Sequence, residues 1–403
     1  MTNIWGLAAL WFGLALVATL ISIWLKIATA LAEIVVGTAA QLIIAMTLGA
    51  TFMGTDQSWI RFLSGAGAIV LTFLAGAELD PAVFKSKWKE ATSIGLAGFA
   101  IPFFGCAAIA FFLLHWEARS AWLGGVAMSA TSVGVVYAVT LELGLNRTGY
   151  GKTLLAACFI NDRLTVLALG LMFSPLTMKT AIFWAGGIVA FAVLPRLTPR
   201  FFKHFGGRPS ELEAKFLLLC LFGLGALAVW ADSQAVLPAY VIGMVLAGTV
   251  GKDHIFIRRL RTLTFGLLTP FYFIRAGSFV SIPALMAAPL AFLALLGGKM
   301  ISKFAGVYPI TRAYQSPKRQ ALYTTLLMST GLTFGTISAL FGLSHNIITQ
   351  SQYSLLVAAV VGSAVVPTMI ANAFYLPRHL LPGPEHVAEG VVQAAHSTTR
   401  TAT

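Results

Sequence analysis

Long apolar runs recur along the whole chain, and they constrain its fold more than any other feature. About thirteen of them approach the roughly 20 residues that a helix needs to cross a bilayer. Of the 403 residues, 58% are hydrophobic and only 10% are charged. Because lipid offers the backbone no hydrogen-bond partners, helices, whose backbone bonds are internal, suit such runs. The sequence therefore predicts an all-α polytopic membrane protein with spans at 4–25, 28–50, 62–79, 92–114, 120–143, 153–173, 180–196, 213–231, 235–250, 262–280, 284–308, 320–343 and 352–376.

The basic residues between these runs predict the orientation of the chain. Loops after even-numbered spans hold only Arg61, Arg119 and Lys179. Loops after odd-numbered spans hold Lys26, Lys85, Lys87, Lys89, Arg147, Lys152, Arg200, Lys203, Arg208, Lys252, Arg258, Arg259, Arg261, Arg312, Lys318, Arg319 and Arg378. Since basic loops stay in the cytoplasm, the N-terminus is expected outside and the C-terminus inside. The first run has no basic n-region and no small-residue cleavage site, so it is expected to be a retained helix.

Several other functions lack support in the sequence. The net charge of +13 falls in short clusters between apolar runs and forms no basic stripe with interleaved aromatics, which argues against nucleic acid as a partner. Cys106, Cys158 and Cys220 show no CxxC spacing, so no metal cluster or disulfide framework is implied. No Walker motif, dinucleotide fingerprint, arginine-rich voltage sensor or TVGYG filter is present. We expect no cofactor and no enzymatic activity.

The chain is expected to have an odd number of spans and to begin outside. Two six-span units of opposite topology, joined by a linker helix, would give this arrangement. Weak internal similarity supports this arrangement: residues 73–81 in span three have a loose echo at 273–279 in span ten, and residues 33–37 in span two resemble 240–243 in span nine. A shift of seven spans reverses orientation, which is typical of the inverted repeats of secondary transporters.

Two spans at equivalent places are predicted to be interrupted helices. Hydroxyl residues stand beside glycines at 128–134, where Thr131 and Ser132 lie, and at 328–336, where Thr330, Gly331 and Thr333 lie. Such residues at mid-membrane depth suit helices that unwind around a cavity, where freed carbonyls can ligate a cation. Close packing of small residues between helices is the alternative. The matched pair favours unwinding.

Asn161-Asp162, near the middle of an apolar span, is the most informative dipeptide of the chain. A carboxylate at this depth costs roughly 2.5–3.5 kcal/mol on insertion scales, so a functional role is expected. Ionised Asp162 offers hard oxygen ligands to a monovalent cation, Na+ or K+, and protonated Asp162 carries one H+. A cation and a proton cannot both occupy Asp162 fully, so their competition for this carboxylate suffices for exchange. The alternative is a buried charge that only pairs with Arg163 or with a lysine of another span.

Lys299, in the middle of span eleven, is the second unusual charge. A buried lysine needs a carboxylate partner or must lose its proton, and Asp162 is the only deep carboxylate. A Lys299–Asp162 contact that breaks when the cation binds is therefore a hypothesis, and a snorkelling lysine is its alternative. Lys303, one turn closer to the cytoplasm, fits snorkelling better.

The polar residues around these two have less defined roles. Asn161 cannot carry charge, so it is expected to orient unwound backbone or a ligand. Arg163 lies about 100° around the helix from Asp162 and need not enter the same site. Glu33 and Arg275, like Arg163, are possible gate residues or charge partners across helices.

These motifs together resemble the monovalent cation/proton antiporter family, specifically its bacterial Nap/Kef-type branch, over the chain to about residue 378. The resemblance depends on residues 130–134, 141–144, 161–162, 298–299 and 73–79. It implies a homodimer in which an ion-transporting core slides like an elevator against a dimerisation domain. Within a transmembrane domain of residues 1–378, spans 1–3 and 8–10 would mainly form the dimerisation domain, spans 4–6 and 11–13 the core, and span 7 the linker, followed by a short polar cytoplasmic tail at 379–403.

By motif match, the resemblance makes Asp162 the ion-binding aspartate, Thr131 and Ser132 the ligands from the unwound helix, and Lys299 the core lysine. Two departures from the family matter. Electrogenic relatives typically carry two adjacent aspartates where this chain has Asn161-Asp162, so electroneutral exchange is expected. Many relatives carry an Arg-Gly-Glu-like sequence where this chain has Thr330, Gly331 and Leu332, which leaves cation selectivity open.

The expected function is exchange of a monovalent cation, with Na+ favoured, for H+ across the bacterial inner membrane, as in pH homeostasis. K+/H+ antiport is the alternative, and from another class a cation channel or a sodium-coupled solute symporter. Kef systems append a nucleotide-binding domain, whereas only a short polar tail follows the last span here, so no nucleotide domain is expected in this chain.

Overall fold

The computed structural model describes residues 4–381 except 26, 50, 78–80, 174–176, 207–209, 232–236, 251–252, 281–285, 287 and 315, and this part of the chain contains helices but no strands. The helices are α1 (Ile4–Leu25), α2 (Thr29–Thr47), α3 (Ser58–Ala77), α4 (Pro81–Ala108), η1 (Ile109–Leu113), α5 (Ala118–Ser129), α6 (Val133–Glu142), η2 (Leu145–Arg147), α7 (Gly149–Phe173), α8 (Met178–Phe205), α9 (Leu212–Trp230), α10 (Leu237–Leu246), α11 (His254–Leu263), η4 (Thr264–Leu268), α12 (Thr269–Ser278), α14 (Pro289–Ala313), α15 (Lys318–Met328), α16 (Thr333–Ser344), α17 (Gln350–Ile370), η5 (Ala371–Tyr375) and η6 (Arg378–Leu380). The prediction of an all-α fold is confirmed.

Eleven helical stretches in the described residues are long and apolar enough to cross a membrane. They correspond to eleven of the thirteen predicted spans. The two others, predicted at 235–250 and 262–280, contain shorter helices, namely α10 and the η4–α12 pair. The residues 78–80 of the third-span motif and the tail from 382 onward lie outside the described residues.

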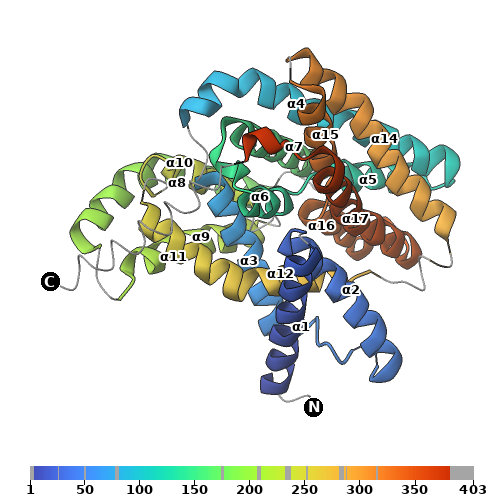
Figure 1. Cartoon of the computed structure of the whole chain (residues 1–403), viewed down its shortest axis with the longest axis horizontal. Coiled ribbons are helices and arrows are strands. Elements are labelled where there is room, and N and C mark those ends of the chain that lie inside the picture. The colour runs from blue at the N-terminus through green and yellow to red at the C-terminus, as the bar shows by residue number, and fades with distance from the viewer. Residues whose placement is uncertain are drawn as a thin grey trace.

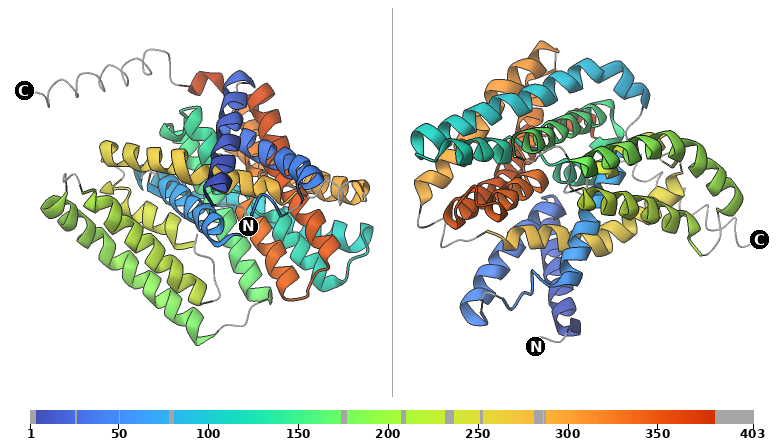
Figure 2. Two further views of the ribbon diagram at one scale, coloured as in Figure 1. Left: turned by 90° about the horizontal axis from the view of Figure 1, so that it is seen from below. Right: turned by 180° about the vertical axis from the view of Figure 1, so that it is seen from behind.

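The helices pack in two groups. We call α4–α7 together with α14–α17 the core group, and α1–α3 together with α8–α12 the scaffold group. Helix α4 packs on α5, α7 and α14, whereas α2 packs on α12 and α3 packs on α10. In Figures 1 and 2, α8 and α9 lie at one end of the molecule, α5 and α14 lie at the other, and α1 and α2 project from one side.

Two helix crossings in the scaffold group have matching contacts. A Cβ on Gly37 or on Gly277 would collide with the backbone carbonyl of the opposite helix, at Ile274 or Ile34 respectively. Gly76 and Gly243 meet in the same way between α3 and α10. Only glycine allows helix backbones to approach this closely. The four glycines belong to the segments that echo each other in the sequence, which agrees with a repeat that places α2 against α12 as it places α10 against α3.

Candidate functional site

Both predicted interruptions are present, and they meet at one crossing inside the core group. Residues 130–132 separate α5 from α6, and residues 329–332 separate α15 from α16. The Ser132 N–H donates to the Thr330 carbonyl at 3.0 Å, and the Thr131 hydroxyl donates to the Met328 carbonyl at 2.8 Å. These residues are fully buried, so the unwound backbone satisfies its polar groups partly on the other segment.

Asn161 joins α7 to this crossing. Its Oδ1 accepts the Thr131 N–H at 2.9 Å, and its Nδ2 lies 3.5 Å from the Gly95 carbonyl of α4. The side chain is fully buried. Asn161 was expected to orient either the unwound backbone or a ligand. In the structure its side chain bonds to the unwound backbone.

Asp162 lies where α6 begins. Its Oδ2 is 3.4 Å from the backbone N–H of Val133, the first residue of α6. The residue is only 4% exposed, and its buried Oδ1 has no hydrogen-bond partner among the residues that the structure describes. The N-terminus of a helix favours negative charge, so α6 stabilises an ionised carboxylate here. The free oxygen remains available to a cation or a proton.

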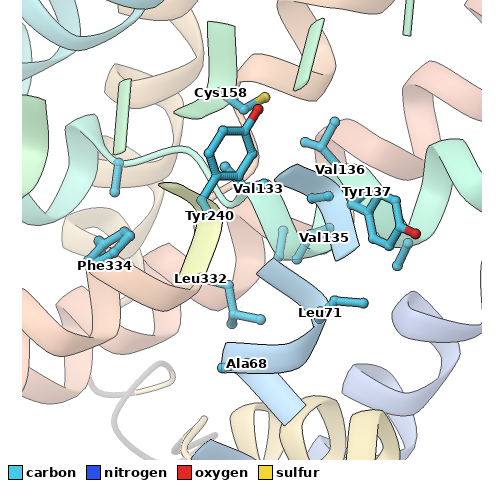
Figure 3. Packing of buried hydrophobic residues seen from close by; sticks show 14 of the residues in the cluster. Ala68, Leu71, Val133, Val135, Val136, Tyr137, Cys158, Tyr240, Leu332 and Phe334 are labelled. Atoms are coloured by element: carbon cyan, nitrogen blue, oxygen red, sulfur yellow. The ribbon is translucent and has the colours of Figure 1, made fainter. Parts of the chain in front are cut away.

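A small pocket adjoins Asp162 at the contact between the two groups of helices. Its volume of about 20 Å³ is enough for about one water-sized species. The lining combines scaffold residues from α3 and α10 with core residues from α6, α7 and α16: Thr72, Tyr240, Val133, Gly134, Phe159, Asp162, Arg163, Thr333 and Phe334. Figure 3 shows three of the lining residues, Tyr240, Val133 and Phe334, which come from three different helices.

Two lysines of α14 bond to the end of α5 and to the interrupted segment that follows it. Lys299 Nζ donates to the Ala130 carbonyl at 3.0 Å and to Ser363 Oγ at 3.0 Å. Lys303 Nζ donates to the Ser129 carbonyl at 3.0 Å and to Thr131 Oγ1 at 2.8 Å. Both lysines are fully buried. Cations are stabilised at the C-terminal end of a helix, where carbonyls lack intrahelical partners.

The lysine contacts change two of the sequence-based expectations. Lys303 was expected to snorkel, which is wrong, because its ammonium is buried on the carbonyl of Ser129. Lys299 bonds to Ala130 and Ser363 in place of the hypothesised Asp162. Sequence reasoning gave Lys303 no part in the site, although its spacing of four residues from Lys299 places both on one face of a helix.

Thr131 and Ser132, predicted as cation ligands, lie differently with respect to Asp162. The Thr131 hydroxyl is engaged on both sides, since it donates to Met328 and accepts from Lys303. Ser132 Oγ caps α6 at the Val135 N–H, 3.4 Å away, and lies 3.4 Å from Thr333 Oγ1. The hydroxyl of Ser132 therefore contacts a residue of the pocket lining, because Thr333 lines the pocket.

The three predicted gate or partner residues fall in different places. Arg163 shares the pocket of Asp162, and its guanidinium lies 5.6 Å and 5.5 Å from the ring centroids of Phe159 and Trp184. The sequence left open whether Arg163 enters the site of Asp162, and the structure places both residues at one pocket.

Arg275 and Glu33 lie away from the pocket lining. Arg275 Nε donates to the Thr55 carbonyl at 2.8 Å, and an Nη lies 3.8 Å from Asp56. Glu33 is buried in α2. Neither residue lines the pocket at Asp162.

Two scaffold tyrosines that sequence reasoning did not single out contact the core group. The Tyr272 hydroxyl bonds to the hydroxyl of Thr333. The Tyr240 ring stacks on Phe159 with centroids 3.9 Å apart and planes 15° apart. Tyr240 is the first residue of the 240–243 segment that resembles residues 33–37. A polar aromatic residue beside the glycine of such a repeated segment is the sequence signal that could have identified Tyr240.

The arrangement defines a membrane protein with one buried carboxylate beside crossed, interrupted helices. The chain matches the family described as sodium/hydrogen exchanger, transmembrane, over residues 12–374. It is 26% identical over 336 residues to cation/H(+) antiporter 17 of Arabidopsis thaliana, covering 78% of this chain and 41% of the relative. It is also 26% identical over 352 residues to an Na(+)/H(+) antiporter of Enterococcus hirae, covering 83% of this chain and 90% of the relative.

The fold is also similar to a solved structure. The sodium proton antiporter MjNhaP1 from Methanocaldococcus jannaschii superposes with a TM-score of 0.69 at 16% identity, covering 91% of this chain and 95% of that chain. The chain thus belongs to the sodium/hydrogen exchanger family of multi-pass membrane proteins. It spans about two fifths of the length of the plant relatives that it matches.

Proposed function

We propose that this protein exchanges a monovalent cation for H+ and that Asp162 carries both in turn. The observation that carries the proposal is the state of its carboxylate: one oxygen is held at the start of α6, and the other is buried without a partner beside a pocket of about 20 Å³. A buried carboxylate without a counter-charge in contact must bind a cation or a proton to be neutral. Since one carboxylate cannot hold both, loading one releases the other.

Na+ is the favoured cation, with K+ as the alternative. Hard carboxylate and hydroxyl oxygens suit both ions. The Enterococcus hirae relative, which this chain matches over 90% of the relative's length, is named an Na(+)/H(+) antiporter.

Electroneutral exchange follows from the neutral side chain of Asn161. Asn161 occupies its acceptor on the Thr131 N–H, and the ammonium groups of Lys299 and Lys303 bond to carbonyl and hydroxyl oxygens. Asp162 is then the one carboxylate at the crossing whose charge changes in the cycle. One cation replaces one proton.

The two groups of helices fit alternating access of the elevator type. The pocket lies between them, so a displacement of the core group against the scaffold group would carry Asp162 from one side of the membrane to the other. In this proposal the scaffold group forms a homodimer, α8 links the halves, and the N-terminus lies outside the bacterial inner membrane. The basic residues of the odd-numbered loops support that orientation.

A sodium-coupled solute symporter is less well supported. Pockets for organic ligands typically measure about 300–1,000 Å³, whereas the space at Asp162 of about 20 Å³ suits a single ion or water. A channel would also need a continuous polar path across the membrane, whereas the pocket at Asp162 has a volume of only about 20 Å³.

Flux in proteoliposomes tests the proposal. Purified protein is reconstituted with an internal pH dye, a pH gradient is imposed, and Na+, Li+ or K+ is added. Proton flux on addition of at least one cation is expected, and the Asp162→Asn variant should abolish it, because asparagine binds no proton. Asp56→Asn, at a side chain 90% exposed, is the matched control and should retain flux. Absence of flux with all three cations would reject antiport.

A further inference from the structure

Tyr240 has a buried hydroxyl group that no neighbouring group satisfies. The residue is 1% exposed, and its hydroxyl has no hydrogen-bond partner among the described residues. A buried donor without a partner loses the hydrogen bonds that it makes with water in the unfolded chain, which destabilises the fold. Buried polar groups without partners are rare enough that each needs an explanation, and an ion or water at the site is one.

The position of the Tyr240 ring brings this hydroxyl to the helix face that carries Asp162. The ring stacks on Phe159, which lies three residues before Asp162 and therefore on the same face of α7. The hydroxyl points toward Cys158, four residues before Asp162 (Figure 3). Cys158 Sγ contacts Met328 Sδ at 3.5 Å, so the sulfur already has a neighbour in the crossing.

Asp162 and Tyr240 line the same pocket. Each also has a buried side-chain oxygen that finds no hydrogen-bond partner in the described part of the chain, Oδ1 of Asp162 and the hydroxyl of Tyr240. One oxygen belongs to the core group and the other to the scaffold group. A cation in the pocket would give both oxygens a partner. The oxygens are of the hard type that alkali cations bind.

We propose that the Tyr240 hydroxyl is a ligand of the cation held by Asp162, so that the cation site is shared between the scaffold and core groups. The proposal rests on the proposed function. It predicts that the site is complete only while α10 lies against α7. Movement of the core group away from Tyr240 removes this ligand from the ion, which favours release on the other side.

The Tyr240→Phe variant removes the oxygen and keeps the stacked ring. We expect its apparent KM for the transported cation in proteoliposomes to rise about tenfold, or about 1.4 kcal/mol, with the maximal rate unchanged. Tyr323→Phe is the control, because the Tyr323 hydroxyl bonds to Asn372 at 2.9 Å, away from the pocket, and its KM should equal that of the wild type. A wild-type KM for Tyr240→Phe would overturn the proposal.

A second measurement separates this inference from the proposed function. Thermal stabilisation of purified protein by added Na+, Li+ or K+ reports binding without transport. The wild type should be stabilised, and Tyr240→Phe should need about tenfold more cation for the same shift. If the wild type transports, Asp162→Asn does not, and Tyr240→Phe matches the wild type in both assays, the shared site is refuted while antiport stands. If the wild type neither binds nor transports cations, both fail.

A poorly folded Tyr240→Phe protein would still leave a test. Tyr240→Gln supplies an amide oxygen in place of the hydroxyl, whereas Tyr240→Leu supplies none. A lower cation KM for the glutamine variant than for the leucine variant is expected. Equal KM values for these two variants would argue against an oxygen ligand at this position.

Discussion

The ammonium of Lys303 lies 2.8 Å from the hydroxyl of Thr131, which in turn donates to the Met328 carbonyl 2.8 Å away. A lysine of α14 thereby connects the two interrupted segments through one hydroxyl. The same ammonium group also donates to the carbonyl of Ser129, the last residue of α5, at 3.0 Å. The crossing therefore contains a second buried lysine, distinct from Lys299, that bonds to both sides of the α5 terminus.

Replacing Lys303 by methionine should destabilise the protein. Met keeps most of the apolar volume but leaves the Ser129 carbonyl and the Thr131 hydroxyl without their donor, at a cost of about 2 kcal/mol. The melting temperature in detergent should fall. Lys87→Met, which breaks only an exposed contact with Glu90, should leave it nearly unchanged, as expected for a surface ion pair. Equal melting temperatures for both variants would show that Lys303 does not hold the crossing.

Replacing Asn161 by aspartate should change the voltage dependence of exchange. Aspartate retains the acceptor for the Thr131 N–H and adds a second carboxylate at the crossing. Exchange by the variant should respond to an imposed membrane potential, whereas wild-type exchange should not. Asn372→Asp, whose Oδ1 likewise accepts a hydrogen bond, is the control. A strong response of the wild type to potential would contradict electroneutral exchange.

Replacing Gly331 by alanine should displace Lys299. The added Cβ would collide with Lys299 Nζ and lie 3.0 Å from Ser363 Oγ and 3.2 Å from the Ala130 carbonyl, so the lysine would lose its bonds to both. We expect a lower melting temperature and a several-fold lower exchange rate. Gly170→Ala on α7 meets no atom within 4 Å and should be neutral or slightly stabilising. Wild-type behaviour of Gly331→Ala would mean that Lys299 can move without consequence.

Protons should compete with the cation at Asp162. Where protons occupy the carboxylate, the apparent KM for the cation should fall about tenfold for each unit of rising pH, since mass action removes the competitor. Maximal rate at saturating cation should be less sensitive. Exchange measured at several cation concentrations and pH values tests this relation. A KM independent of pH across the active range would exclude a shared carboxylate.

Much of the architecture could be predicted from the sequence because burial in lipid constrains sequence directly. Helices must satisfy their own backbone, so apolar length alone located the spans, including α1, predicted at 4–25 and found at Ile4–Leu25. The two interruptions were also predictable, since hydroxyl residues and glycines are unusual at that depth. The Asn161-Asp162 pair stood out for the cost of a charge in an apolar helix.

The partners of these groups could not be predicted in the same way. Lys303 is of a residue type that often snorkels near the end of a span. Only the packing of α14 against α5 decides that its side chain bonds to Ser129 instead. Lys299 was expected near Asp162 because charge attracts charge, but the free carbonyl of Ala130 is its acceptor. Arg163 borders the pocket with its guanidinium over the rings of Phe159 and, on α8, Trp184.

The sequence by itself determined that the chain is a bundle of membrane helices with two interruptions and one deep carboxylate, because hydropathy and the cost of buried charge act on each residue within its own helix. Only the tertiary structure decided that two lysines cap α5, that Asp162 faces a pocket between two groups of helices, and that Tyr240 borders it. Those contacts join residues distant in sequence, and they depend on the close approach of helix backbones, which local patterns do not encode.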